Sequence, residues 1–120
     1  MSICHITEEN LDSYLMTDYL LIDFWAKWCQ PCLGFSKIIE KTSEDNADFT
    51  FASVDIEEQE KLAEEFEISS VPTVMILRKG IIIYVGTGAH TYEVLQDLLE
   101  QARHIDDGQL AEIVEEQSKM

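Results

Sequence analysis

The fold is decided by the stretch Ile22-Asp23-Phe24-Trp25-Ala26-Lys27-Trp28-Cys29-Gln30-Pro31-Cys32. It begins inside a short apolar run, residues 20–25, whose length and β-forming side chains predict a buried strand. A segment of helical periodicity follows it as far as residue 46. Pro31 fits the first turn of that helix, because the N–H that proline lacks has no partner there. The stretch therefore places two cysteines where a buried strand passes into a helix.

The spacing of these two cysteines allows three interpretations. In the first they form a redox pair, because the N-terminus of a helix stabilises a thiolate. The second is a metal site, which needs further ligands, and only the adjacent pair Cys4 and His5 could supply them. The third is a pair of buried cysteines without chemistry. Their place at the start of a helix favours the redox pair.

The rest of the chain continues the alternation of strands and helices. A strand is expected over residues 49–55, an acidic helix over 57–66 and a strand over 73–77, and the turn Arg78-Lys79-Gly80 leads into a strand over 81–85. Thr91 is expected to cap a helix that ends near residue 105, with Val94 among its core positions, and Thr7 to cap a first helix. This order predicts an α/β fold, with a central mixed sheet of parallel strands plus an antiparallel hairpin and helices on both faces.

Composition excludes several classes of protein. The 120 residues are enough for one domain, and 8 basic against 24 acidic residues give a net charge of −16. A nucleic-acid-binding protein needs the opposite sign on at least one face. No apolar run approaches the ~20 residues of a membrane helix, and the N-terminus lacks the pattern of a secretory signal. We therefore expect a cytoplasmic protein that binds neither nucleic acid nor membrane.

The sequence resembles the thioredoxin family over residues 1–105. The resemblance rests on the cysteine stretch quoted above, the segment Val71-Pro72-Thr73, the turn Lys79-Gly80 and the pair Gly88-Ala89. It implies a thioredoxin fold and a protein-disulfide reductase that works as a monomer. It also implies that no metal or other cofactor is bound, since the redox group is the Cys29–Cys32 disulfide. Client proteins that contain disulfides, and a thioredoxin-reductase-like donor of electrons from NADPH, would be its partners.

The resemblance also assigns roles to single residues. Cys29 would be the exposed nucleophile that attacks a client disulfide, and Cys32 the thiol that resolves the mixed disulfide. Asp23 matches the buried carboxylate beneath the pair, whose pKa burial would raise. The positions expected to contact clients are Trp28, Gln30, Pro31, the backbone of Val71, the family's cis-proline at Pro72, and the loop residues Gly88 and Ala89.

Four residues depart from the family pattern. Gln30 replaces a glycine without adding charge, and with Pro31 it predicts a reducing potential of about −270 to −230 mV. Ser53 replaces a lysine near the buried carboxylate, so Asp23 should be harder to ionise. Lys37 replaces a helix-kinking proline, which predicts a straighter helix. Leu33 replaces a lysine and makes the surface beside the cysteines more apolar.

Two functions of other classes remain as alternatives. The chain could be a thioredoxin-fold adaptor or chaperone-like binding module with little redox cycling, or a dimer that holds a metal or cluster through Cys29 and Cys32. Residues 106–120 form an acidic C-terminal extension beyond the resemblance. Asp106-Asp107-Gly108 is expected to end the preceding helix, with a further turn or two after it. This extension is either a solvated acidic face or a segment that docks on the domain or a basic partner.

Overall fold

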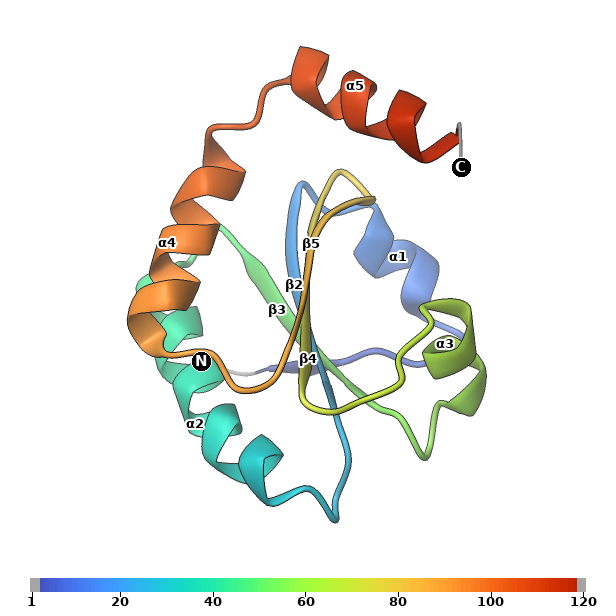
Figure 1. Ribbon diagram of the computed structural model, residues 1–120, viewed down its shortest axis with the longest axis vertical. Helices are drawn as coiled ribbons and strands as arrows, with labels where there is room; N and C mark the ends of the chain where they lie inside the picture. Colours follow the sequence, from blue (N-terminus) through green and yellow to red (C-terminus); the bar gives the residue numbers. More distant parts are fainter. Residues whose placement is uncertain (1–2, 119–120) are drawn as a thin grey trace.

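A five-stranded mixed sheet forms the centre of the computed structural model, which describes residues 3–118 (Figure 1). Its strands, in the spatial order β1-β3-β2-β4-β5, are β1 Cys4–His5, β3 Thr50–Asp55, β2 Tyr19–Trp25, β4 Thr73–Arg78 and β5 Ile81–Thr87. The first three run parallel to one another, whereas β4 runs antiparallel to both β2 and β5. The predicted mixed sheet with its terminal hairpin is confirmed.

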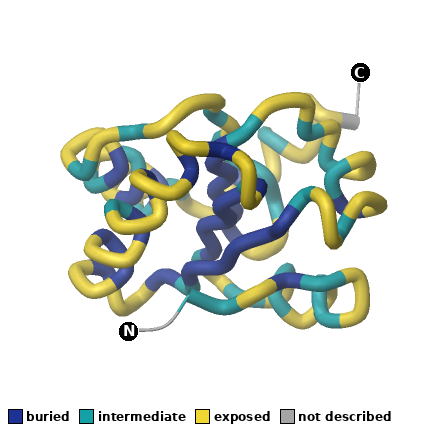
Figure 2. Tube along the Cα trace, turned by 90° about the horizontal axis from the view of Figure 1, so that it is seen from below, coloured by how far each residue is buried: buried dark blue, intermediate teal, exposed yellow. Residues whose placement is uncertain are grey.

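Helices cover both faces of this sheet and create two cores. On one face lie α2 Gln30–Asp45 and α4 Tyr92–Arg103, and on the other lie α1 Leu11–Leu15 and α3 Glu60–Glu65 (Figure 1). Alternate residues of each strand point to opposite faces. Leu21 and Phe51 therefore pack beneath α2 and α4, whereas Ile22 and Val54 pack in the other core. The buried strands run through the middle of the molecule with the exposed helical surfaces outside them (Figure 2).

Three local expectations were wrong. The acidic helix is shorter than residues 57–66, because Oδ1 of Asp55 accepts hydrogen bonds from the N–H groups of Glu57 and Glu58 and holds them in a turn. Thr7 does not cap α1; it exchanges hydrogen bonds with Asn10 in the turn before that helix. Val94 is exposed and does not belong to the core side of α4. The expected cap at Thr91 is present, since its Oγ1 accepts a hydrogen bond from the N–H of Val94.

The C-terminal extension forms one continuous helix, α5 Asp107–Ser118. Asp106 and Gln109 make reciprocal side-chain-to-backbone hydrogen bonds of 2.8 and 2.9 Å, a capping box that starts the helix. Leu110 is buried, and Nε2 of Gln117 donates to the carbonyl oxygen of Ile82 in β5. The extension thus folds back on the sheet, at the end opposite the start of α2 (Figure 1). Within residues 3–118, no helix is long and apolar enough to span a membrane.

Candidate active site

Cys29 and Cys32 form a disulfide at the N-terminus of α2. Cys29 is the N-cap residue, with an extended backbone, and its Sγ accepts a hydrogen bond of 3.1 Å from the N–H of Cys32. Pro31 lies in the first turn, as predicted. The helix therefore directs a backbone N–H at Cys29, and a negative charge on that sulfur would be stabilised there.

Both sulfurs are covered in this disulfide form. The expectation that Cys29 is exposed is wrong here, since 4% of its surface is accessible, against 2% for Cys32. The cause is packing: the two cysteines form a cluster with Ala26, against which Trp25 and Val71 lie. Exposure therefore does not distinguish the attacking thiol from the resolving one.

The Val71–Pro72 loop faces the same cluster. The peptide bond between these two residues is cis. The N–H of Gly88 donates to the carbonyl oxygen of Pro72 at 2.8 Å, which joins this loop to the Gly88-Ala89 segment. Because the β4 ladder begins at Thr73, the backbone of Val71 lies just outside the sheet. The structure thus brings three separate parts of the sequence together: the cysteine pair, the cis-proline loop and the Gly88-Ala89 loop.

Asp23 lies on the α2 face of β2 and is 4% exposed. Burial raises the pKa of its carboxyl to about 7, because the charged form is poorly solvated there. Among the described residues, none forms a hydrogen bond with its buried Oδ1. The expected buried carboxyl is therefore present, and desolvation places its pKa close to neutral pH.

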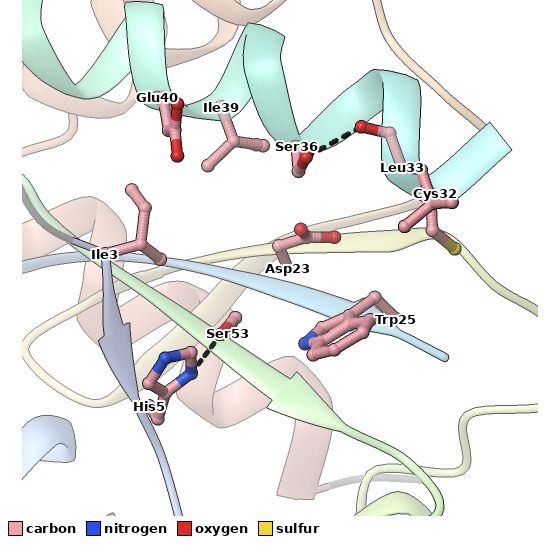
Figure 3. Close-up of a pocket in the computed structure, with 10 residues that line it drawn as sticks. All are labelled: Ile3, His5, Asp23, Trp25, Cys32, Leu33, Ser36, Ile39, Glu40 and Ser53. Carbon is pink, nitrogen blue, oxygen red and sulfur yellow. Dashed lines mark hydrogen bonds between the residues drawn. The ribbon is translucent and has the colours of Figure 1, made fainter. Parts of the chain in front are cut away.

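A cavity of about 260 Å³ lies under the start of α2 and contains this carboxyl (Figure 3). Asp23, Trp25 and Cys32 line it near the disulfide, and the remaining lining residues are Ile3, His5, Leu33, Ser36, Ile39, Glu40 and Ser53. Within residues 3–118, the lining contains neither lysine nor arginine. Ser53, the partner of Asp23 in the β2–β3 register, thus stands beside the carboxyl without supplying a charge.

The surface around the disulfide is neutral and partly apolar. Trp28 is 65% and Leu33 46% exposed, and Gln30 and Pro31 are exposed beside them. Lys37 lies on the outer side of α2, which runs through its 16 residues as one element. The predicted contact positions therefore do surround the cysteine pair, with an indole side chain projecting into solvent.

His5 and Ser36 are cavity residues that the sequence analysis did not identify. His5 was a candidate only for a metal pair with Cys4, yet its Nδ1 lies 2.9 Å from Oγ of Ser53 (Figure 3). The period-two alternation of strands could have placed His5 on the face of Asp23, but the pairing of β1 with β3 was needed to bring it near. Among residues 3–118, no group of three or more His, Cys, Asp or Glu side chains could hold a metal ion.

Comparison with known proteins agrees with this geometry. The thioredoxin family model matches residues 2–101. The chain belongs to the thioredoxin family. A thioredoxin-named protein of Streptomyces coelicolor is 41% identical over 117 residues, which cover 97% of this chain and 87% of the relative, so the match reaches into α5. The thioredoxin of Chlamydia pneumoniae is 32% identical over 96 residues, covering 80% of this chain and 94% of that protein.

Solved structures show the same likeness. A mutant thioredoxin from Halobacterium salinarum superposes with a TM-score of 0.79 at 27% identity, over 84% of this chain and 90% of the other. Thioredoxins are protein-disulfide oxidoreductases that use no bound cofactor, and their active group is the redox cysteine pair. The chain accordingly carries out thiol–disulfide exchange, with Cys29 and Cys32 as its redox-active disulfide.

Proposed function

We propose that this thioredoxin reduces protein disulfides in the cytoplasm, as an electron carrier that maintains the thiol redox state of the cell. The observation that carries the proposal is the position of Cys29 as N-cap of α2, with the N–H of Cys32 directed at its sulfur. This arrangement stabilises a thiolate at Cys29, which is the nucleophilic form of a cysteine.

The reaction proceeds by two exchanges of a sulfur–sulfur bond. The Cys29 thiolate attacks a client disulfide, forms a mixed disulfide and releases one client sulfur as a thiolate, which takes a proton. Cys32 then loses its proton to the Asp23 carboxylate and attacks Cys29 Sγ, so that the second client thiolate leaves. Two electrons pass to the client, and the Cys29–Cys32 disulfide forms.

The client chain is proposed to bind across the loops that surround the disulfide. An extended client segment would pair with the backbone of Val71 next to Pro72. Trp28 offers an exposed ring beside the cysteines for apolar contact. The remaining positions of this client site are Gln30, Pro31, Gly88 and Ala89.

We further propose how the protein is recharged and assembled. A thioredoxin-reductase-like protein, supplied by NADPH, would reduce the Cys29–Cys32 disulfide, and the chain would act as a monomer. The exposed surface beside the disulfide carries Leu33 in place of a family lysine. A reductase that binds through apolar contacts therefore fits this surface better than one that relies on a lysine there.

The deciding experiment follows the reduction of insulin by dithiothreitol, with wild-type protein, Cys29→Ser and Cys32→Ser. We expect the wild type to accelerate reduction and both variants to be inactive, with Cys32→Ser alone accumulating a stable mixed disulfide with the client. Cys4→Ser is the matched control, because Cys4 is the free cysteine outside the site, and it should retain full activity.

The potential of the pair provides the second measurement. Equilibration with glutathione should give a value of about −270 to −230 mV, whereas a value near −120 mV would indicate an oxidant and contradict the proposal. A Cys29→Ser variant with unchanged cellular function would instead support the adaptor alternative. Metal that copurifies under reducing conditions with a dimer would support the metal-bridged alternative.

A further inference from the structure

Three side chains form a row across adjacent strands, from the cavity beneath the disulfide to the surface. The register pairs His5 of β1 with Ser53 of β3, and it pairs Ser53 with Asp23 of β2. Paired residues of neighbouring strands point to the same face of a sheet, which here is the face covered by α2. His5 Nδ1 lies 2.9 Å from Ser53 Oγ (Figure 3). The row therefore leads from a buried carboxyl to an exposed imidazole.

The cavity lets these groups communicate. All three line the same space of about 260 Å³, and one water molecule needs only about 10–15 Å³. Oδ1 of Asp23 is buried and has no hydrogen-bond partner among the described residues. The wall is mostly apolar, but His5, Ser53 and Asp23 add polar atoms to it. Polar groups within reach, sufficient volume and an unpartnered acceptor are the conditions under which water bridges buried groups.

We propose that His5, acting through Ser53 and water in this cavity, exchanges the proton of Asp23 with solvent in each redox cycle. The inference rests on the proposed role of Asp23 as the group that takes the proton of Cys32. After that transfer, the carboxylic acid passes its proton along the row to solvent, and the carboxylate is regenerated. His5 and Ser53 are positioning residues, since neither touches a reacting sulfur.

The chemistry of the two side chains suits this task. A hydroxyl group both donates and accepts hydrogen bonds, so Ser53 can pass a proton in either direction. An imidazole exchanges protons near neutral pH, and its second nitrogen remains available to solvent when the first faces Ser53. A lysine at position 53, as in the family pattern, would place a fixed positive charge beside the carboxyl. Ser53 and His5 instead provide a path along which a proton can move.

Other charged groups also face this region. Glu40 reaches the cavity from α2, and in Figure 3 it lies beside Ile39, at the end away from Cys32. Lys27, Asp55 and Glu58 line an adjoining pocket of about 230 Å³ together with His5. Glu40 is therefore the rival group for proton exchange, and it requires its own variant.

The test separates the two exchanges in time. Reduced protein is mixed with a saturating chromogenic aromatic disulfide in a stopped-flow instrument, where the first thiolate release reports attack by Cys29 and the second reports resolution by Cys32. Wild type is compared with His5→Gln and Ser53→Ala. Glu40→Gln tests the rival group for proton exchange. His104→Gln is the control, since His104 is an exposed histidine at the C-terminal end of α4. Each is measured from about pH 6 to about pH 9 at low buffer concentration and again with added imidazole.

We expect His5→Gln and Ser53→Ala to slow the second release about tenfold at neutral pH and low buffer concentration, without slowing the first. Added imidazole should restore the His5→Gln rate to within about twofold of wild type, because an external base can replace a lost proton acceptor. Glu40→Gln and His104→Gln should match the wild type.

Four results would overturn the proposal. They are an unchanged rate in His5→Gln, a slow rate that imidazole does not restore, a slow second release in Glu40→Gln alone, and an Asp23→Asn variant as fast as wild type. Ser53→Ala tests the same path if His5→Gln does not fold. A wild-type protein that shows no second release would overturn the proposed function itself, whereas a normal wild type with an unchanged His5→Gln overturns the proton path alone.

Discussion

Replacing Asp23 by asparagine should remove most of the pH dependence of stability between about pH 4 and about pH 8. The carboxyl is 4% exposed, and burial raises its pKa from 3.8 to about 7. In the unfolded chain the same carboxyl is solvated and ionises at its ordinary pKa. From about pH 4 to about pH 7 the folded state therefore holds a proton that the unfolded state has already released.

The sign and size of the effect follow from this difference. Below the unfolded value both states are protonated, and Asp23 contributes no pH dependence. As the pH rises through 3.8 the unfolded state is favoured progressively, until the folded carboxyl ionises at about pH 7. Since one pKa unit is worth about 1.4 kcal/mol, the loss of stability is about 2 kcal/mol at pH 5 and reaches about 4 kcal/mol at pH 8.

Urea unfolding of the disulfide form, followed by the fluorescence of Trp25 and Trp28, measures the effect. The difference in free energy of unfolding between Asp23→Asn and wild type should shift by about 2 kcal/mol in favour of the variant from pH 5 to pH 8. Asp12→Asn, at an exposed carboxyl of α1, is the control and should leave the wild-type profile unchanged. Parallel pH profiles for wild type and Asp23→Asn would refute the argument, because they would mean that Asp23 ionises alike in both states.

Three further substitutions test other parts of the molecule. Leu110→Ala should lower the free energy of unfolding in urea by about 2 kcal/mol, because this side chain is buried. Val114 is exposed on the same helix, so Val114→Ala should change that free energy by less than about 0.5 kcal/mol. Equal effects of the two substitutions would contradict docking of α5. Arg78→Met should cost about 2 kcal/mol by the same assay, because it leaves two carbonyl oxygens at the C-terminal end of α4 without their buried donor. Trp28→Ala should raise the KM for insulin about tenfold in the reduction assay at unchanged stability, and an unchanged KM would exclude this ring from the client site.

Much of the fold could be predicted because the relevant signals are local. The apolar run at residues 20–25 and Pro31 in the first helical turn are properties of short segments, and both lie where they were expected. The errors arose where one side chain redirects the backbone. Asp55 holds the following residues in a turn, and the capping box of Asp106 with Gln109 starts a helix of 12 residues where a break and only a further turn or two were expected. The second signal was present in the sequence, as an acidic residue with glutamine three positions later.

The candidate site also contains residues that the sequence could predict and one that it could not. The closeness of Cys29, Cys32 and a buried Asp23 could be predicted because they lie within one contiguous stretch that a family resemblance covers. His5 could not, because its closeness to Asp23 depends on the pairing of β1 with β3 and of β3 with β2, between strands far apart in the chain. Register of this kind is a property of the assembled sheet. A histidine near the N-terminus acquires a role only once Ser53 stands between it and the carboxyl.

The environment of Asp23 places two opposing demands on the site. A carboxyl with a pKa of about 7 can both take and release a proton at neutral pH, whereas one at its ordinary value would remain ionised. Burial without a neighbouring cation produces that pKa, yet burial also separates the carboxyl from the water that must receive its proton.

A lysine beside the Asp23 carboxyl would favour ionisation and lower the pKa. The neutral hydroxyl of Ser53, hydrogen-bonded to His5, avoids adding a charge beside the carboxyl and still leads toward the surface. Ser53→Lys should therefore lower the pKa of Asp23. The loss of stability with rising pH should then end at a lower pH than in the wild type.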